Sequence, residues 1–311
     1  MQSQPRKKRK SFPTHIIVFL APAFLIYSLF MIIPLLDSLR LSFVDSETEL
    51  FVGFQNYATL LTNRLWADQF WNAFWNNVKF FIVHMVVQNP IALFLAALLS
   101  QRTLRWTNQY RTLIFMPTVL SVVIIGFIWQ LILSPLWGIS EGFLSFFGLG
   151  ALFQPWLGLE TTALTTISLI SVWQFVGIPL MLFYAALIGI PDELIEAAYV
   201  DGANAWTVFW RVKFPLILPT VGIVAILTFV GNFNAFDLIY TVKGALAGPN
   251  FATDIMGTMF FRTFFGQQLQ LGNTSMGSTV AAMMLLIILG GVLCYLVGWQ
   301  RRFQTYEVER N

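Results

Sequence analysis

The sequence predicts an all-α polytopic membrane protein with six transmembrane helices. Of its 311 residues, 57% are hydrophobic and only 11% are charged, whereas soluble domains have about 25% charged residues. Apolar runs of about 20 residues are long enough to cross a hydrocarbon core about 30 Å thick. Six such runs lie at roughly 16–36, 78–99, 112–133, 161–189, 216–240 and 278–299. Because spans in one bilayer pack together, residues 16–300 are expected to form a single transmembrane domain.

The basic residues predict the orientation of these spans. Thirteen of the 18 Lys and Arg residues fall on one side: Arg6 to Lys10, Arg102, Arg105, Arg111, Arg211, Lys213, Arg301, Arg302 and Arg310. The positive-inside rule places this side in the cytoplasm, with a basic N-terminus at 1–15 and a tail at 301–311. Six spans also require both ends on one side. A basic cluster can bind nucleic acid, but beside a span we interpret Arg6 to Lys10 as an orientation signal.

The first apolar run is expected to be retained as a span. The basic start and the sequence Ala21-Pro22-Ala23 imitate a secretory signal peptide. However, the apolar run continues for about a dozen residues past Ala23, and Pro22 occupies the place of the cleavage site. The only cysteine, Cys294, lies in the last run, so no intramolecular disulfide is possible.

Three outer segments connect the spans. Residues 37–77 contain Trp66, Trp71 and Trp75, and Trp favours the membrane–water interface, so one or two helices lying along the outer surface are expected. Residues 134–160 predict a re-entrant or interfacial turn. Residues 241–277 predict a loop that leads into a short helix.

Residues 190–215, which we call the elbow, form an unusually long connector between the fourth and fifth spans. Pro191 is expected to end the fourth span, and the acidic residues after it favour the N-terminus of a short helix. Gly202 suits the left-handed position that ends a helix, and Asn204 can cap a second helix. Pro215 is expected to end that second helix.

The surface of the elbow predicts a docking site for another protein. Ala197 and Ala198 keep the first helix thin, which allows a partner backbone to approach closely, and Glu196 is expected to be exposed. The alternative is an amphipathic interfacial helix without a partner. Small residues, exposed carboxylates and a tight turn together favour docking.

The elbow resembles the cytoplasmic EAA motif of importer permeases of the ATP-binding cassette (ABC) superfamily. The resemblance rests on Glu196, Ala197, Ala198, Asp201, Gly202, Ala203, Pro215 and Pro219. From about residue 15 onward the chain is also similar to the carbohydrate-uptake branch, in particular to first-permease subunits such as the maltose and glycerol-phosphate permeases. Residues 53–57 and 232–240 carry that likeness. One departure is the stretch 241–249, which is longer than the tight turn usual in the branch.

The resemblance implies a type I ABC importer permease fold in a bacterial cytoplasmic (inner) membrane. It implies a second permease subunit, two ABC ATPase subunits and an extracytoplasmic solute-binding protein as partners. Segment 190–215 would be the coupling helix, with Glu196 paired to a basic group of the ATPase. ATP and Mg²⁺ would be bound by the ATPases, because this chain has no Gly-Lys dipeptide and therefore no phosphate-binding loop. No cofactor is expected in this chain.

Polar residues inside the spans are candidates for solute contact, because each is costly in hydrocarbon. They are His84, Gln88, Asn89, Gln130, Trp173, Gln174, Asn232, Asn234 and Asp237. Amides and a carboxylate beside an aromatic face suit a sugar, so Trp173, Gln174, Asn232, Asn234 and Asp237 are predicted to line the substrate pathway. For any single residue the alternative is interhelical hydrogen bonding. A proton relay through His84 is not favoured, and Asn89-Pro90 is interpreted as a kink.

The sequence does not predict an enzyme. Residues 138–142 match the Gly-x-Ser-x-Gly nucleophile elbow, which needs a histidine later in the chain, but the only histidines are His15 and His84. Two classes remain: a non-catalytic permease subunit for a sugar, polyol or sugar-like osmolyte, and a self-contained carrier or channel driven by an ion gradient. Such carriers often contain two related halves, which we do not find.

Overall fold

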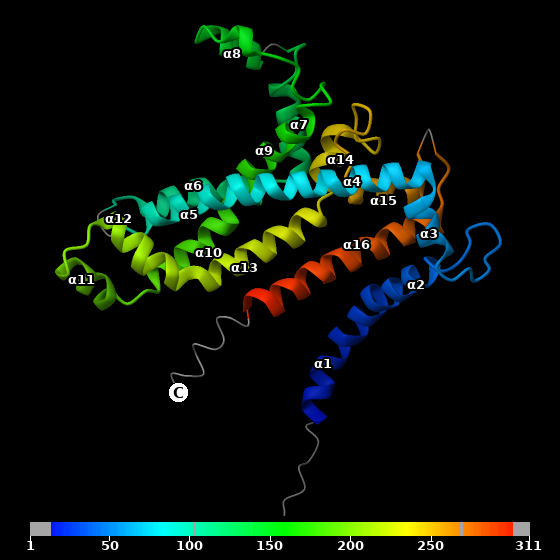
Figure 1. Cartoon of the computed structure of the whole chain (residues 1–311), viewed down its shortest axis with the longest axis horizontal. Helices are drawn as coiled ribbons and strands as arrows, with labels where there is room; N and C mark the ends of the chain where they lie inside the picture. Colours follow the sequence, from blue (N-terminus) through cyan, green and yellow to red (C-terminus); the bar gives the residue numbers. More distant parts are fainter. Residues whose placement is uncertain (1–13, 102–103, 138, 268–269, 301–311) are drawn as a thin grey trace, which may run out of the picture.

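The computed structural model describes residues 14–101, 104–137, 139–267 and 270–300. Within these ranges every regular element is a helix, and the long helices run side by side along one axis (Figure 1). Four helices are long and apolar enough to span a membrane, or up to six if each of two bent pairs is one span. The basic cluster Arg6 to Lys10, Arg102, Gly138 and the tail 301–311 lie outside the described residues.

The first span lies at the edge of the bundle (Figure 1). It consists of α1 (Thr14–Tyr27), the π-helix η1 (Ser28–Ile32) and α2 (Ile33–Leu41). In the most apolar stretch of this span, no residue is buried inside the chain. Helix α2 packs on α16. In a membrane its apolar side chains would face lipid or a neighbouring subunit.

The second span begins earlier than the sequence indicates. After α3 (Gln55–Thr62), α4 (Arg64–Val83), the π-helix η2 (His84–Gln88) and α5 (Asn89–Leu99) form one helix of 36 residues. Asn63 starts it by accepting a hydrogen bond from the Leu65 N–H at 3.1 Å. The aromatic half of the first outer segment therefore continues directly into the span. The residues directly before Asn89-Pro90, where we expect a kink, form a wide π turn within this continuous helix.

The third and fourth spans are broken. Helices α6 (Thr107–Val119) and α7 (Val122–Ile132) meet at 93°, and α9 (Ala163–Phe175) and α10 (Gly177–Ile188) meet at 44°. Thr118 donates to the Gln174 carbonyl oxygen at 2.9 Å, which joins the two bends. Apolar periodicity carries no signal for such bends, so the sequence predicted unbroken spans. Between the pairs lie α8 (Ile139–Phe146) and η3 (Gly150–Leu152), with α8 projecting from the bundle (Figure 1).

The elbow and the remaining spans complete the bundle. The elements are α11 (Asp192–Val200), α12 (Ala205–Val208), η4 (Phe209–Lys213), α13 (Phe214–Phe233), α14 (Asp237–Lys243), α15 (Met256–Phe265), α16 (Thr274–Tyr295) and η5 (Leu296–Gln300). The expectation that Pro215 ends the second elbow helix is wrong, because the chain continues as a helix from α12 through η4 into α13. The π turn of η4, closed by the Phe214 N–H on the Phe209 carbonyl oxygen, precedes the proline at the start of α13.

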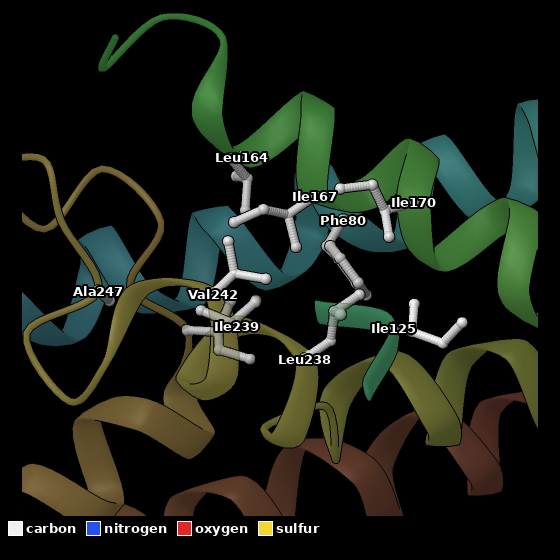
Figure 2. Packing of buried hydrophobic residues seen from close by; sticks show 10 residues of the cluster. Phe80, Ile125, Leu164, Ile167, Ile170, Leu238, Ile239, Val242 and Ala247 are labelled. Atoms are coloured by element: carbon white, nitrogen blue, oxygen red, sulfur yellow. The ribbon is translucent and has the colours of Figure 1, made fainter. Parts of the chain in front are cut away.

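Three apolar clusters hold the helices together. The first joins α4, α7, α9 and α14 through residues such as Phe80, Ile125, Ile167 and Ile239, all of which converge in Figure 2. The second joins α5, α10 and α13, and the third joins α3, α4, α13, α15 and α16. Lipid tails are as apolar as these side chains, so close packing, not exclusion of water, favours these contacts.

Candidate functional site

The helix breaks surround a cavity inside the bundle. Its volume is about 350 Å³, and its walls come from α4 with η2, α7, α9, α10, α13 and α14. Irregular backbone at membrane depth is tolerated where it lines such a cavity. The polar side chains on its wall are His84, Gln88, Ser171, Thr228, Asn232, Asn234 and Asp237.

His84 forms a fixed part of the cavity wall. Its side chain is buried, with Nδ1 2.8 Å from the Phe80 carbonyl oxygen and Nε2 3.0 Å from the Ser171 hydroxyl. A carbonyl oxygen only accepts, so Nδ1 carries the proton, and the Nε2 of a neutral ring then accepts from Ser171. Both ring nitrogens are used within the chain.

The amides of the wall keep oxygens without partners. Asn232 donates to the Thr228 carbonyl oxygen at 2.6 Å, and Asn234 donates to the Val230 carbonyl oxygen at 3.0 Å. Within the described chain, the buried Asn232 Oδ1 and Gln88 Oε1 have no hydrogen-bond partner. A buried oxygen without a partner is costly. Both oxygens are enclosed by the surrounding side chains, so they are unpaired acceptors beside the cavity and are not exposed to it.

The structure brings together part of the set that the sequence predicts for the pathway. Asn232, Asn234 and Asp237 line the cavity. Trp173 instead packs edge-on against Trp129, with ring centroids 5.7 Å apart. Gln174 is fully buried and lies beside the bend between α6 and α7, donating to the Leu120 carbonyl oxygen at 3.4 Å.

Two other intramembrane amides bond between helices. Asn89 donates to the Thr228 hydroxyl at 3.2 Å, and Gln130 donates to the Val242 carbonyl oxygen at 2.5 Å.

Sequence reasoning missed Ser171 and Thr228 as wall residues, because single hydroxyl residues are common in spans and commonly bond to their own helix.

The turn of the elbow has the geometry that its sequence predicts. Gly202 has φ +82°, the left-handed region that favours glycine. The Ala203 N–H donates to the Ala198 carbonyl oxygen and the Gly202 N–H to the Tyr199 carbonyl oxygen, both at 3.0 Å. This pair of bonds is the Schellman helix ending. Asn204 then accepts from the Thr207 N–H at 2.8 Å and caps α12.

The elbow has an exposed and largely apolar surface. Glu196 is exposed, Val200 is 88% exposed and Trp206 is 71% exposed. Trp206 and Trp210 pack against each other with centroids 5.6 Å apart. An exposed apolar patch beside a carboxylate is typical of a site that contacts another protein or the membrane surface.

A second polar cluster, which the sequence did not indicate, lies in the segment after α14. Arg262 of α15 and Asp254 are almost completely buried and form an ion pair of 2.8 Å. Asn76 of α4 donates to the Asp254 carbonyl oxygen at 2.9 Å. Asn77 donates to the Asn232 carbonyl oxygen and accepts from the Met256 N–H, both at 2.8 Å. The loop before α15 is thereby tied to the cavity end of α13.

These features define a multi-span membrane protein with an exposed elbow between two spans and a largely apolar cavity that carries a few polar groups at the breaks of its helices. Residues 88–302 match the family model of binding-protein-dependent transport system inner membrane components. The chain belongs to this family, so it is a permease component of an ABC transporter and not an enzyme.

Individual relatives and solved structures agree with this family. The chain is 28% identical to an osmoprotective compounds uptake permease of Synechocystis, over 93% of this chain and 99% of the relative. It is 29% identical to a probable permease for starch degradation products of Thermoanaerobacterium thermosulfurigenes, over 87% and 89%. A chain in the crystal structure of a bacterial alginate ABC transporter has the same fold, with TM-score 0.77, 20% identity and coverage of 91% and 92%.

Proposed function

We propose that this chain is the first-permease subunit of an importer of the carbohydrate-uptake branch. With a sister permease it forms the pathway for a sugar, a polyol or a sugar-like osmolyte. Two partner ATPases bind ATP and Mg²⁺, and an extracytoplasmic binding protein delivers the solute. Both termini face the cytoplasm. The observation that carries this proposal is the cavity, whose neutral amide and hydroxyl groups at membrane depth suit a hydroxylated solute.

The relatives support the solute class. One is named for the uptake of osmoprotective compounds and the other for starch degradation products. Starch degradation products are hydroxylated sugars, which agrees with the solute class proposed for this chain. The similarity to both extends over most of each chain, including the segments that form the cavity.

The elbow supports coupling to an ATPase. Its short first helix exposes Glu196 and Val200, and its Schellman turn fixes the direction of the second helix, which runs unbroken into α13. A force applied to the elbow would therefore act on α13, whose other end carries Asn232 and Asn234. Closure of the ATPases would rock the spans between inward-open and outward-open arrangements.

The energy source distinguishes this proposal from a carrier driven by an ion gradient. Uptake of radiolabelled sugar by cells is measured with a proton uncoupler while ATP is maintained, and with the partner ATPase mutated at its ATP-binding lysine. Under the proposal, uptake survives the uncoupler and is lost in the ATPase mutant. The reverse pattern would establish an ion-driven carrier.

Glu196→Lys tests the coupling role of the elbow. The substitution reverses an exposed charge without removing a packing contact, so the protein is expected to insert normally while ATP-driven uptake falls at least about tenfold, equivalent to about 1.4 kcal/mol. Glu160→Lys, which reverses an exposed charge in the segment between α8 and α9, is the matched control. If Glu196→Lys transports and co-purifies with its ATPase as Glu160→Lys does, Glu196 has no role in docking.

A further inference from the structure

Among the described residues, the cavity wall has one negatively charged group and no positively charged group. Asp237, in the first turn of α14, is exposed and is the only charged residue on the wall among those that the structure describes. The nearest cation along the chain, Lys243 at the other end of α14, donates to the Leu157 carbonyl oxygen and does not line the cavity. A solute in the cavity therefore meets a carboxylate without a matching cation from this chain.

The neutral polar groups of the wall do not offset this negative charge. The side chain of Ser171 is used on His84, and Thr228 donates to the Val224 carbonyl oxygen at 2.8 Å. One N–H of the Asn232 amide is also used within its own helix. Gln88 Oε1 and the Asn232 Oδ1 are enclosed without a partner in the described chain, and neither carries a charge. Among the described wall residues, Asp237 alone therefore sets the charge that a solute meets.

We propose that this wall selects neutral, hydroxyl-rich solutes and rejects anionic sugars, with Asp237 as the residue that determines charge specificity. This inference rests on the proposed function and narrows its solute class. Sugar hydroxyl groups donate to carboxylate and amide oxygens. A uronate or a sugar phosphate would bring a second negative charge close to Asp237, and like charges repel each other.

Binding of a matched pair of disaccharides tests the inference. Cellobiose and cellobiouronate differ only by a carboxylate in place of one hydroxymethyl group. Saturation-transfer NMR on the full chain, assembled with its sister permease in lipid nanodiscs, measures weak binding of each. We expect cellobiose to give at least about tenfold more saturation transfer than cellobiouronate, and Asp237→Asn to reduce that ratio to near one by admitting the uronate.

Two control variants locate the effect. Asp68→Asn removes an exposed carboxylate of α4 that does not line the cavity, and it should leave the ratio unchanged. Gly231 lines the cavity, and a Cβ added there meets no atom within 4 Å. Gly231→Leu should therefore occupy the open space and abolish the cellobiose signal.

The possible outcomes separate this inference from the proposed function. Equal binding of both sugars by the unmodified chain, or a ratio that Asp237→Asn does not change, would overturn the selectivity. Binding of neither sugar, or a signal that survives Gly231→Leu, would show that this cavity is not the solute site. The uptake assay with the uncoupler and the ATPase mutant judges the proposed importer independently of each of these results.

Discussion

At the scale of single residues, the direction of the elbow depends on Gly202. Its φ of +82° places the chain in a region where a Cβ clashes with the following carbonyl group. The two Schellman bonds and the Asn204 cap form on either side of this residue. The angle between α11 and α12 therefore depends on one backbone conformation.

Gly202→Val should disturb this turn and weaken ATPase docking. A β-branched residue in the left-handed region costs roughly 1–2 kcal/mol, so the amount of ATPase that co-purifies with the permease should fall about tenfold while membrane insertion persists. Gly290→Ala is the control, because Gly290 lies within α16 and an added Cβ there meets nothing within 4 Å. Equal ATPase recovery from both variants would contradict a role of the turn in docking.

At the scale of elements, α15 and the loop before it form a polar attachment to α4. Arg262 donates to both carboxylate oxygens of Asp254, at 3.1 and 2.8 Å, and also to the Ala245 carbonyl oxygen at 3.0 Å. Asn76 and Asn77 fix the adjacent backbone from α4. A buried ion pair is weak evidence for net stability, but removing one partner leaves the other charge uncompensated.

Asp254→Ala should therefore lower the free energy of unfolding by about 3–5 kcal/mol, because Arg262 stays buried without its carboxylate. The midpoint of thermal unfolding in detergent measures the loss. Asp45→Ala is the control: Asp45 lies in an exposed turn and its side chain accepts only local bonds from Glu47 and Thr48. A shift as small as that of Asp45→Ala would show that Arg262 finds another partner or leaves the core.

At the scale of the whole molecule, the cavity lies where broken helices from four parts of the chain meet. The bends of α6–α7 and α9–α10 are joined to each other, and α13 links the cavity to the elbow. Breaks in packed helices are natural hinge positions, so rocking of the spans about the cavity is expected to change its access from one side of the membrane to the other.

Labelling of a cysteine in the cavity tests this motion. In a Cys294→Ser background, Ala235→Cys places a thiol on the cavity wall. Its reaction with a membrane-impermeant maleimide from the outside should change at least about threefold when vanadate traps the assembled transporter after ATP hydrolysis. Thr48→Cys, at an exposed position outside the cavity, should label equally in both states. Identical labelling of Ala235→Cys in both states would argue against alternating access at this cavity.

Several features follow from the sequence alone because their signals are local. Apolar runs indicate the membrane-length helices and the helical fold class. In the elbow, Gly202 and Asn204 encode the turn and the cap through their own backbone and side-chain preferences. Glu196 is exposed as expected, and Asn232, Asn234 and Asp237 lie together at the cavity, since they are close in sequence where α13 ends and α14 begins.

Only the tertiary structure decided the features that depend on contacts between distant segments. The 93° bend between α6 and α7 is joined to α9 through Thr118 and the Gln174 carbonyl oxygen, and hydropathy contains no trace of that contact. Hydropathy also contains no signal for the position of Ser171 on the cavity wall or for the Asp254–Arg262 ion pair. Local preferences determine which segments become helices and where they turn. The arrangement of polar groups around a cavity is determined by packing between distant segments, as the bond between Asn77 and Asn232, 155 residues apart, illustrates.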